Sequence, residues 1–203
     1  VLDQLDPLTL LRITLVHLTD SNLGCTSSPA RWSEDDGLRP FSHDCIAAMN
    51  DRRVLVDLAH ISRKGFFDAA QAHRRDLPFV VTHTGVEGVY PHWRNLTDEQ
   101  IRAVADSGGF VGIMYEIRFL GPGRSATRET IVDHLEHVIR VGGEHLPALG
   151  SDWDGCILTP PDMRTAAEFP LLVDSMLKRG WSTDRIERIL GGNALGVIEA
   201  IRG

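Results

Sequence analysis

Four polar residues, His17, His60, His83 and Asp152, each end an apolar run of this sequence. Imidazoles and a carboxylate are typical of sites that bind a metal ion or move a proton, because neutral imidazole suits zinc and a carboxylate serves as ligand or as acid and base. A single histidine in such a place is more often a hydrogen-bonded structural residue. The same pattern on four of five runs indicates a functional site.

The five apolar runs of the sequence, four of which end on these residues, read as strands covered on both faces, because their apolar residues are continuous rather than alternating. They are RITLVH (12–17), VLVDLAH (54–60), PFVVTH (78–83), FVGIMY (110–115) and LPALGSD (146–152). Segments with helical spacing separate the runs, which predicts a parallel sheet of the α/β class. The carboxyl ends of parallel strands open on one face, so the four polar residues are expected to meet there.

Local signals predict where several of these helices begin. Ser42 and Ser62 are placed as N-caps, and Thr97 with Gln100 has the spacing of a capping box. Further helices are expected over residues 127–143, 168–180 and 182–203, the last broken near Gly191 and Gly192. The segment 20–40 is the one long loop, and a loop of that length in a compact domain is more often functional than idle.

Two architectures fit this order of elements. A (β/α)8 barrel needs eight strand-helix units in about 250 residues, and only five are visible in the 203 residues, so a partial barrel is one prediction. An open doubly wound sheet is the alternative, although no glycine-rich phosphate loop follows the first strand. Either way the length predicts a single domain.

The composition excludes several functional classes. A net charge of -7 without a basic run argues against nucleic acid and against an anionic membrane surface. We find no apolar stretch of about 18 residues and no signal peptide, so a cytoplasmic protein without a membrane anchor is expected. Three cysteines without a CxxC pair fit a reducing compartment.

Other polar residues have competing interpretations. Asp57 must be paired if it is buried, either to orient a histidine or for structure alone. Arg94 follows His83 closely and is either a carboxylate-binding residue or a surface arginine. His134 and His137 are more plausible as solvated or packing residues of a helix than as metal ligands. Surface placement is expected for the remaining histidines, His43, His73, His92 and His145.

Taken together, these residues resemble the membrane (renal) dipeptidase family, the M19 zinc peptidases of the amidohydrolase-like barrels. The resemblance is carried in order by ITLVHLTDSNLG, VLVDLAHIS, VVTHTG followed by RN, DHLEHVIRVGG, LGSDWDG and GGNALGVIEAI. It implies a (β/α)8 barrel in which two zinc ions, bridged by a glutamate and a water, hydrolyse dipeptides. A hydroxide held by the metals attacks the scissile carbonyl.

The resemblance also implies a role for each site residue. His60 and His83 match the histidines that ligate one zinc ion, and His17 the histidine that contacts substrate and stabilises the oxyanion. Arg94 matches the arginine that holds the substrate carboxylate. Asp152 matches the aspartate that handles the proton and the substrate amine. Dimers are common in the family, so a homodimer is expected.

The sequence departs from the family at its beginning. The His-x-Asp pair and the bridging glutamate of the family have no counterpart here, so the chain is expected to be the C-terminal five-eighths of a barrel, with at most one zinc ion. Three alternatives stay open. They are a truncated non-catalytic remnant, another metal-dependent amidohydrolase acting on N-acyl amino acids or lactones, and a metal-free small-molecule-binding domain.

Overall fold

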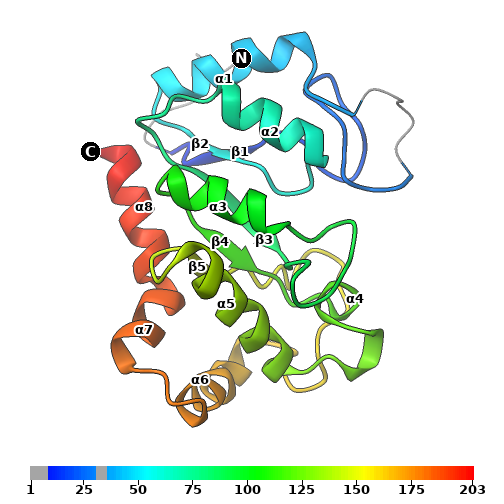
Figure 1. Ribbon diagram of the computed structural model, residues 1–203, viewed down its shortest axis with the longest axis vertical. Helices are drawn as coiled ribbons and strands as arrows, with labels where there is room; N and C mark the ends of the chain where they lie inside the picture. Colours follow the sequence, from blue (N-terminus) through cyan, green and yellow to red (C-terminus); the bar gives the residue numbers. More distant parts are fainter. Residues whose placement is uncertain (1–8, 31–35) are drawn as a thin grey trace.

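The computed structural model describes residues 9–30 and 36–203, in which five parallel strands alternate with helices (Figure 1). The strands lie side by side in chain order: β1 (Arg12–Thr14), β2 (Leu55–Asp57), β3 (Phe79–Thr84), β4 (Val111–Ile113) and β5 (Pro147–Leu149). Successive strands of a (β/α)8 barrel neighbour one another in this way, whereas a doubly wound sheet reverses its order at a switch point. The predicted α/β class is confirmed, and the strand order matches the partial barrel.

Four of the five strands are shorter than the apolar runs that predict them, and β3 is as long as its run but begins and ends one residue later. The second run spans residues 54–60, yet β2 ends at Asp57. Leu58 and Ala59 are buried in the core although they lie outside the strand, and so are Leu15 and Val16 after β1. Residues beyond the last strand residue are buried too, so hydrophobicity alone overestimates the length of β1 and β2. The residues that follow a strand turn into the loops that build one face of the sheet.

In the part of the chain that the structure describes, eight α-helices connect the strands and follow the last one. They are α1 (Pro40–Asp51), α2 (Arg63–Ala72), α3 (Asp98–Asp106), α4 (Ile117–Leu120), α5 (Arg128–Gly142), α6 (Phe169–Lys178), α7 (Thr183–Glu187) and α8 (Asn193–Arg202). Short 3-10 turns lie at Gly123–Ser125 and Ala166–Glu168, and a π-helical turn at Arg188–Gly192 joins α7 to α8 at the predicted break.

Helix capping follows the sequence at two of the three predicted positions. Thr97 and Gln100 form the capping box of α3, and the Ser62 hydroxyl accepts from the Gly65 N–H at the start of α2. The prediction for Ser42 is wrong. Because Pro40 has the fixed φ of a first helical residue, α1 begins two residues earlier, and the Ser42 hydroxyl donates instead to the carbonyl oxygen of Leu23.

The sheet is packed on both faces. Val54 and Val56 belong to the main core beneath α1 and α2. Leu55 points the other way and packs with Val197 and Ile201 of α8. The chain end is fixed there by a hydrogen bond from Arg202 to the backbone of Leu10. In the described residues, no helix combines the length and hydropathy needed to cross a membrane.

Candidate functional site

Three histidines lie in a row where β1, β2 and β3 end. The ring centroids of His17 and His60 are 4.5 Å apart, and those of His60 and His83 are 4.7 Å apart, both in edge-on geometry. The Nε2 atoms of His60 and His83 face each other across 2.7 Å. The structure thus brings together the three histidines that the strand-end pattern singles out.

The backbone is strained at two of the predicted site residues. His60 has φ +67° and Asp152 has φ +61°, in the left-handed region that non-glycine residues rarely adopt. The turn at His60 is held from the long loop, because the Ser27 N–H donates to its carbonyl oxygen across 2.7 Å. A bridge between Gly24 and Leu38 joins two parts of this loop, and a bridge between Thr26 and Ile61 joins the loop to the residue after His60. Such strain is often found where a fold must aim a functional side chain.

Both facing imidazoles are neutral at physiological pH. Burial, with help from the Arg94 charge and the other histidines, lowers the pKa of His60 to about 2. Burial and Arg94 likewise lower the pKa of His83 to about 4. Neutral imidazole is the form that binds metal ions. The pair therefore fits one divalent ion as two of its ligands, although the described residues include no group of three or more histidine, cysteine, aspartate or glutamate side chains that could complete the set.

Asp57 is fully buried beneath this row and is saturated with hydrogen bonds. Its Oδ2 atom accepts from Arg12 Nη1, Thr14 Oγ1 and Thr82 Oγ1, at 3.0, 2.8 and 2.7 Å. Its Oδ1 atom accepts from the N–H groups of Ala59 and Thr82 at 3.0 and 3.1 Å. Thr82 Oγ1 also lies 2.9 Å from His83 Nδ1. Asp57 thus ties β1, β2 and β3 together and reaches His83 through one hydroxyl.

Arg94 is a buried residue, not a surface arginine, and is 4% exposed. Its Nη2 atom donates to the carbonyl oxygen of His83 across 2.8 Å, and its buried Nε has no partner among the described residues. Burial lowers the pKa of Arg94 to about 10, against the opposing influence of Asp57 and Asp152, so the guanidinium stays charged. A buried donor without a partner is rare in folded proteins and indicates a place for an acceptor from outside.

A cavity of about 270 Å³ opens beside these residues and is lined by His17, His60, Arg94 and Asp152. Burial raises the pKa of the Asp152 carboxyl, opposed by Arg94 and His17. The Asp152 carboxylate can lie here because residue 155 is glycine. A Cβ at residue 155 would collide with this carboxylate. The cavity therefore combines the imidazoles of His17 and His60, the cation of Arg94, and a carboxylate that holds a proton more readily than usual.

The remaining wall of the cavity includes residues that the sequence patterns did not single out. Glu116 is buried just after β4, where it pairs with Arg118 at 2.8 Å and accepts from the N–H of Leu158. Its place directly after the run 110–115 is the same strand-end signal that marks His60 and His83. Trp93 and Phe119 line the rim with rings 5.8 Å apart, and no simple spacing predicts this contact.

The other histidines divide between the core and the surface. His134 and His137 pack inside the molecule: His134 bridges the Val86 N–H and the Leu120 carbonyl, and His137 contacts Asp98. The surface placement expected for His73 is wrong, because its ring is buried against Phe79 and bonds to the carbonyl of Leu77.

His92 is also only partly exposed, which differs from the expectation. Its ring contacts those of Trp93 and Phe119 in tilted geometry, at centroid distances of 4.9 and 4.5 Å. His43 and His145 are exposed, as expected.

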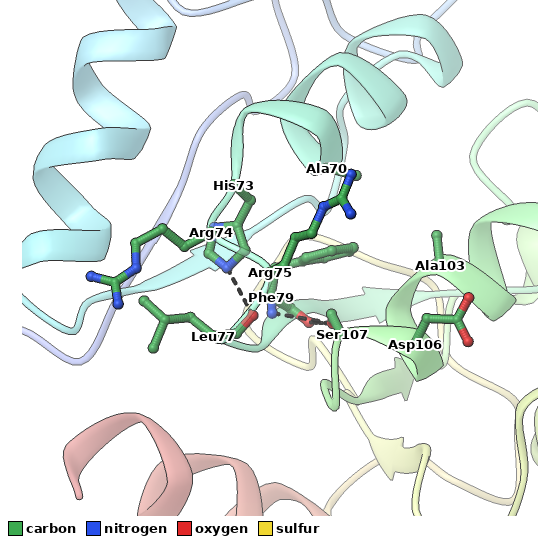
Figure 2. A pocket seen from close by; sticks show the side chains of 9 residues that line it. All are labelled: Ala70, His73, Arg74, Arg75, Leu77, Phe79, Ala103, Asp106 and Ser107. Atoms are coloured by element: carbon green, nitrogen blue, oxygen red, sulfur yellow. Dashed lines mark hydrogen bonds between the residues drawn. The ribbon is translucent and has the colours of Figure 1, made fainter.

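A larger cavity of about 430 Å³ lies away from this site, at the amino-terminal end of β3 (Figure 2). Leu77 and Phe79 form its floor, with Ala70 and Ala103 on the flanking helices α2 and α3. Two of the polar side chains drawn there bond within the protein: His73 to the carbonyl of Leu77, and Ser107 to the backbone of Phe79 and to the carbonyl of Val104, although the Nδ1 atom of His73 is buried without a partner among the described residues. The smaller cavity is the better candidate for a binding site, because several polar groups converge on it.

Comparisons with known proteins agree with this geometry. The chain is 34% identical over 179 residues to an uncharacterized protein in the pqqA 5' region of Klebsiella pneumoniae, covering 86% of this chain and 65% of that protein. It is 32% identical over 192 residues to dipeptidase tcpJ of Claviceps purpurea, covering 93% of this chain and 44% of that protein. The chain thus spans less than two thirds of either curated relative.

A solved structure shares both fold and sequence. The crystal structure of a metallo peptidase from Rhodobacter sphaeroides, liganded with a phosphinate mimic of the dipeptide L-Ala-D-Ala, matches with a TM-score of 0.77 and 31% identity. The match covers 82% of this chain and 48% of that protein. The model of the membrane dipeptidase family, peptidase family M19, matches residues 1–202. This chain therefore belongs to the membrane dipeptidase family M19.

Proposed function

We propose that the chain carries part of the active site of a zinc-dependent dipeptidase. The observation that carries the proposal is the approach of His60 Nε2 to His83 Nε2, 2.7 Å apart, next to a cavity lined by His60, Arg94 and Asp152. Family membership supports it, and so does the metallo peptidase relative that binds a dipeptide mimic. The imidazole donors favour zinc over harder ions such as magnesium.

His60 and His83 are the residues that would hold the metal, each through Nε2. A zinc ion, when bound, supplies positive charge that polarises a carbonyl oxygen and makes water more acidic. A catalytic zinc site usually has three protein ligands. The two histidines are thus part of a ligand set that the described residues do not complete.

The chain's own residues would bind and orient the substrate. The buried Arg94 guanidinium, with its unpartnered Nε, would receive the free carboxylate of a dipeptide. That contact restricts substrates to short peptides, because the carboxylate must lie close to the scissile bond. His17, exposed beside His60, would donate a hydrogen bond to the oxygen on which negative charge develops.

Asp152 would move the proton that the leaving amine requires. Burial raises the pKa of its carboxyl, so it holds a proton more readily than an ordinary aspartate. When the Asp152 carboxyl is ionised, it would attract the cationic free amine of the substrate. A dipeptide, with a cationic amine and an anionic carboxylate, is therefore complementary to Asp152 and Arg94 together.

The test combines metal analysis with hydrolysis assays on the protein. We expect bound zinc, hydrolysis of an unblocked dipeptide, loss of hydrolysis after chelation, and recovery on adding zinc. The dipeptide amide and the N-acetyl dipeptide serve as matched substrates that lack one charge each. Full hydrolysis by the metal-depleted protein would contradict the proposal, and preference for an N-acyl amino acid would indicate a different amidohydrolase.

A further inference from the structure

We infer that Thr82 is a positioning residue that holds the His83 ring in one tautomer, with the proton on Nδ1 and the lone pair of Nε2 directed at His60. The inference rests on the proposed function, in which His60 and His83 bind a metal ion. It gives Asp57, beyond its role in joining three strands, and Thr82 a task in metal binding, because a metal ion needs the unprotonated nitrogen of an imidazole.

The first step concerns the charge state of Asp57. Arg12 Nη1 donates to Oδ2, and the N–H groups of Ala59 and Thr82 donate to Oδ1. A guanidinium and a backbone N–H can only donate, so both oxygens of Asp57 are acceptors. The side chain is fully buried, and these donors stabilise the carboxylate there.

The second step concerns the single proton of the Thr82 hydroxyl. Thr82 Oγ1 lies 2.7 Å from Asp57 Oδ2 and 2.9 Å from His83 Nδ1. If the proton pointed to His83, two oxygen acceptors would face each other across 2.7 Å without a proton between them. The hydroxyl proton therefore goes to Asp57, and the Thr82 oxygen accepts from His83 Nδ1–H.

The third step concerns the other nitrogen of the His83 ring, which must be unprotonated to bind a metal ion. A neutral imidazole with its proton on Nδ1 has its lone pair on Nε2, which faces His60 Nε2 across 2.7 Å. In the metal-free protein, His60 must then supply the proton of this contact and hold it on Nε2. Binding of a metal ion would change the tautomer of His60 but not that of His83.

Nuclear magnetic resonance of the protein with nitrogen-15 labelled histidine tests the inference without metal or activity. In the metal-free wild type near pH 7, we expect His83 to be protonated on Nδ1 and His60 on Nε2. Thr82→Val should lower the fraction of His83 protonated on Nδ1, while Thr82→Ser should keep it. Thr84→Val is the matched control, because the Thr84 hydroxyl is buried on the same strand and bonds to the carbonyls of Gly85 and Arg94 instead.

Titration with zinc gives the second readout. Thr82→Val should raise the zinc Kd by about 10–100-fold, as for other outer partners of metal-binding histidines, while Thr82→Ser and Thr84→Val should change it little. His83 protonated on Nε2 in the wild type would overturn the inference, and so would identical behaviour of Thr82→Val and Thr84→Val. If the tautomers are as expected but zinc does not bind the histidines, the proposed function fails while the hydrogen-bond assignment stands.

Discussion

Arg94 donates through Nη2 to the backbone carbonyl of His83, across 2.8 Å. This bond joins the proposed anchor for the substrate carboxylate to the residue whose ring faces His60. A change at Arg94 therefore affects both substrate binding and the end of β3. A substrate with a free carboxylate and a substrate without one separate the effect on substrate binding from the effect on the structure.

Replacement of Arg94 by Lys or Met should weaken transition-state binding of dipeptides. A charged hydrogen bond is worth about 1.5–3 kcal/mol, so kcat/KM for an unblocked dipeptide should fall by about 10–100-fold. Lysine keeps the charge but not the planar fork, and should recover only part of the loss. The dipeptide amide, which lacks the carboxylate, should lose much less. An equal loss for both substrates would show that Arg94 acts only on the structure.

Removal of His60 or His83 should abolish tight zinc binding. Each alanine variant loses a direct ligand, so the zinc Kd should rise by more than the about 10–100-fold that outer partners contribute. Calorimetric titration measures this. His43→Ala, an exposed histidine on α1, is the control and should leave the Kd unchanged. Tight binding that survives in both single variants would place the metal elsewhere.

Gly155→Ala should impair catalysis much more than folding. The added Cβ would collide with the Asp152 carboxylate and displace it. A displacement of about 1 Å costs on the order of 100-fold in rate, so kcat/KM should fall by about that factor. The exposed Gly196 of α8 has open space around it, and Gly196→Ala should keep full activity while gaining about 0.5–1 kcal/mol of stability. Normal activity in Gly155→Ala would exclude a role for Asp152 in its present position.

Acid should destabilise the protein partly through His134. Burial lowers the pKa of this histidine to about 4, against an ordinary value of 6.5. Between these two pH values the unfolded chain binds a proton that the folded chain does not, so the free energy of unfolding falls as the pH decreases. The full loss is about 3 kcal/mol, and it is absent above about pH 6.5.

Urea unfolding at several pH values measures this effect. The His134→Gln variant should show a smaller dependence of unfolding free energy on pH between 4 and 6.5 than the wild type. The exposed His43→Gln variant should retain the wild-type dependence. The slopes of unfolding free energy against pH are compared, because the stability lost by replacing a hydrogen-bonded histidine lowers the whole curve without changing its slope. Equal slopes in His134→Gln and the wild type would contradict the prediction.

The order of the elements could be predicted because it depends on local information. Each apolar run contains a strand, and the Thr97 capping box is complete within four neighbouring residues. The ends of the strands could not be predicted from hydrophobicity, since Leu58 is as buried outside the sheet as the residues of β2, and Leu15 is more buried than the residues of β1. The start of α1 was misplaced because the fixed φ of Pro40 prevails over the capping preference of Ser42.

The convergence of His17, His60 and His83 could be predicted because parallel strands end on one face. The hydrogen-bond network of Asp57 could not be predicted, because it depends on the register of β1, β2 and β3. In that register Asp57 lies opposite Thr14 of β1 and Val80 of β3. Glu116 also follows a strand, but it was not predicted as a site residue. It lies one position after the apolar run 110–115, whereas His60 is the last residue of its own run.

The left-handed backbone at His60 and Asp152 has a consequence for protein engineering. A non-glycine residue in this region costs about 1–2 kcal/mol, and glycine relieves that cost. A library selected for thermal tolerance alone would therefore favour glycine at both positions. Its most heat-resistant members would be the ones that had lost a proposed zinc ligand and a proposed proton carrier, so such a selection needs a parallel screen for zinc retention.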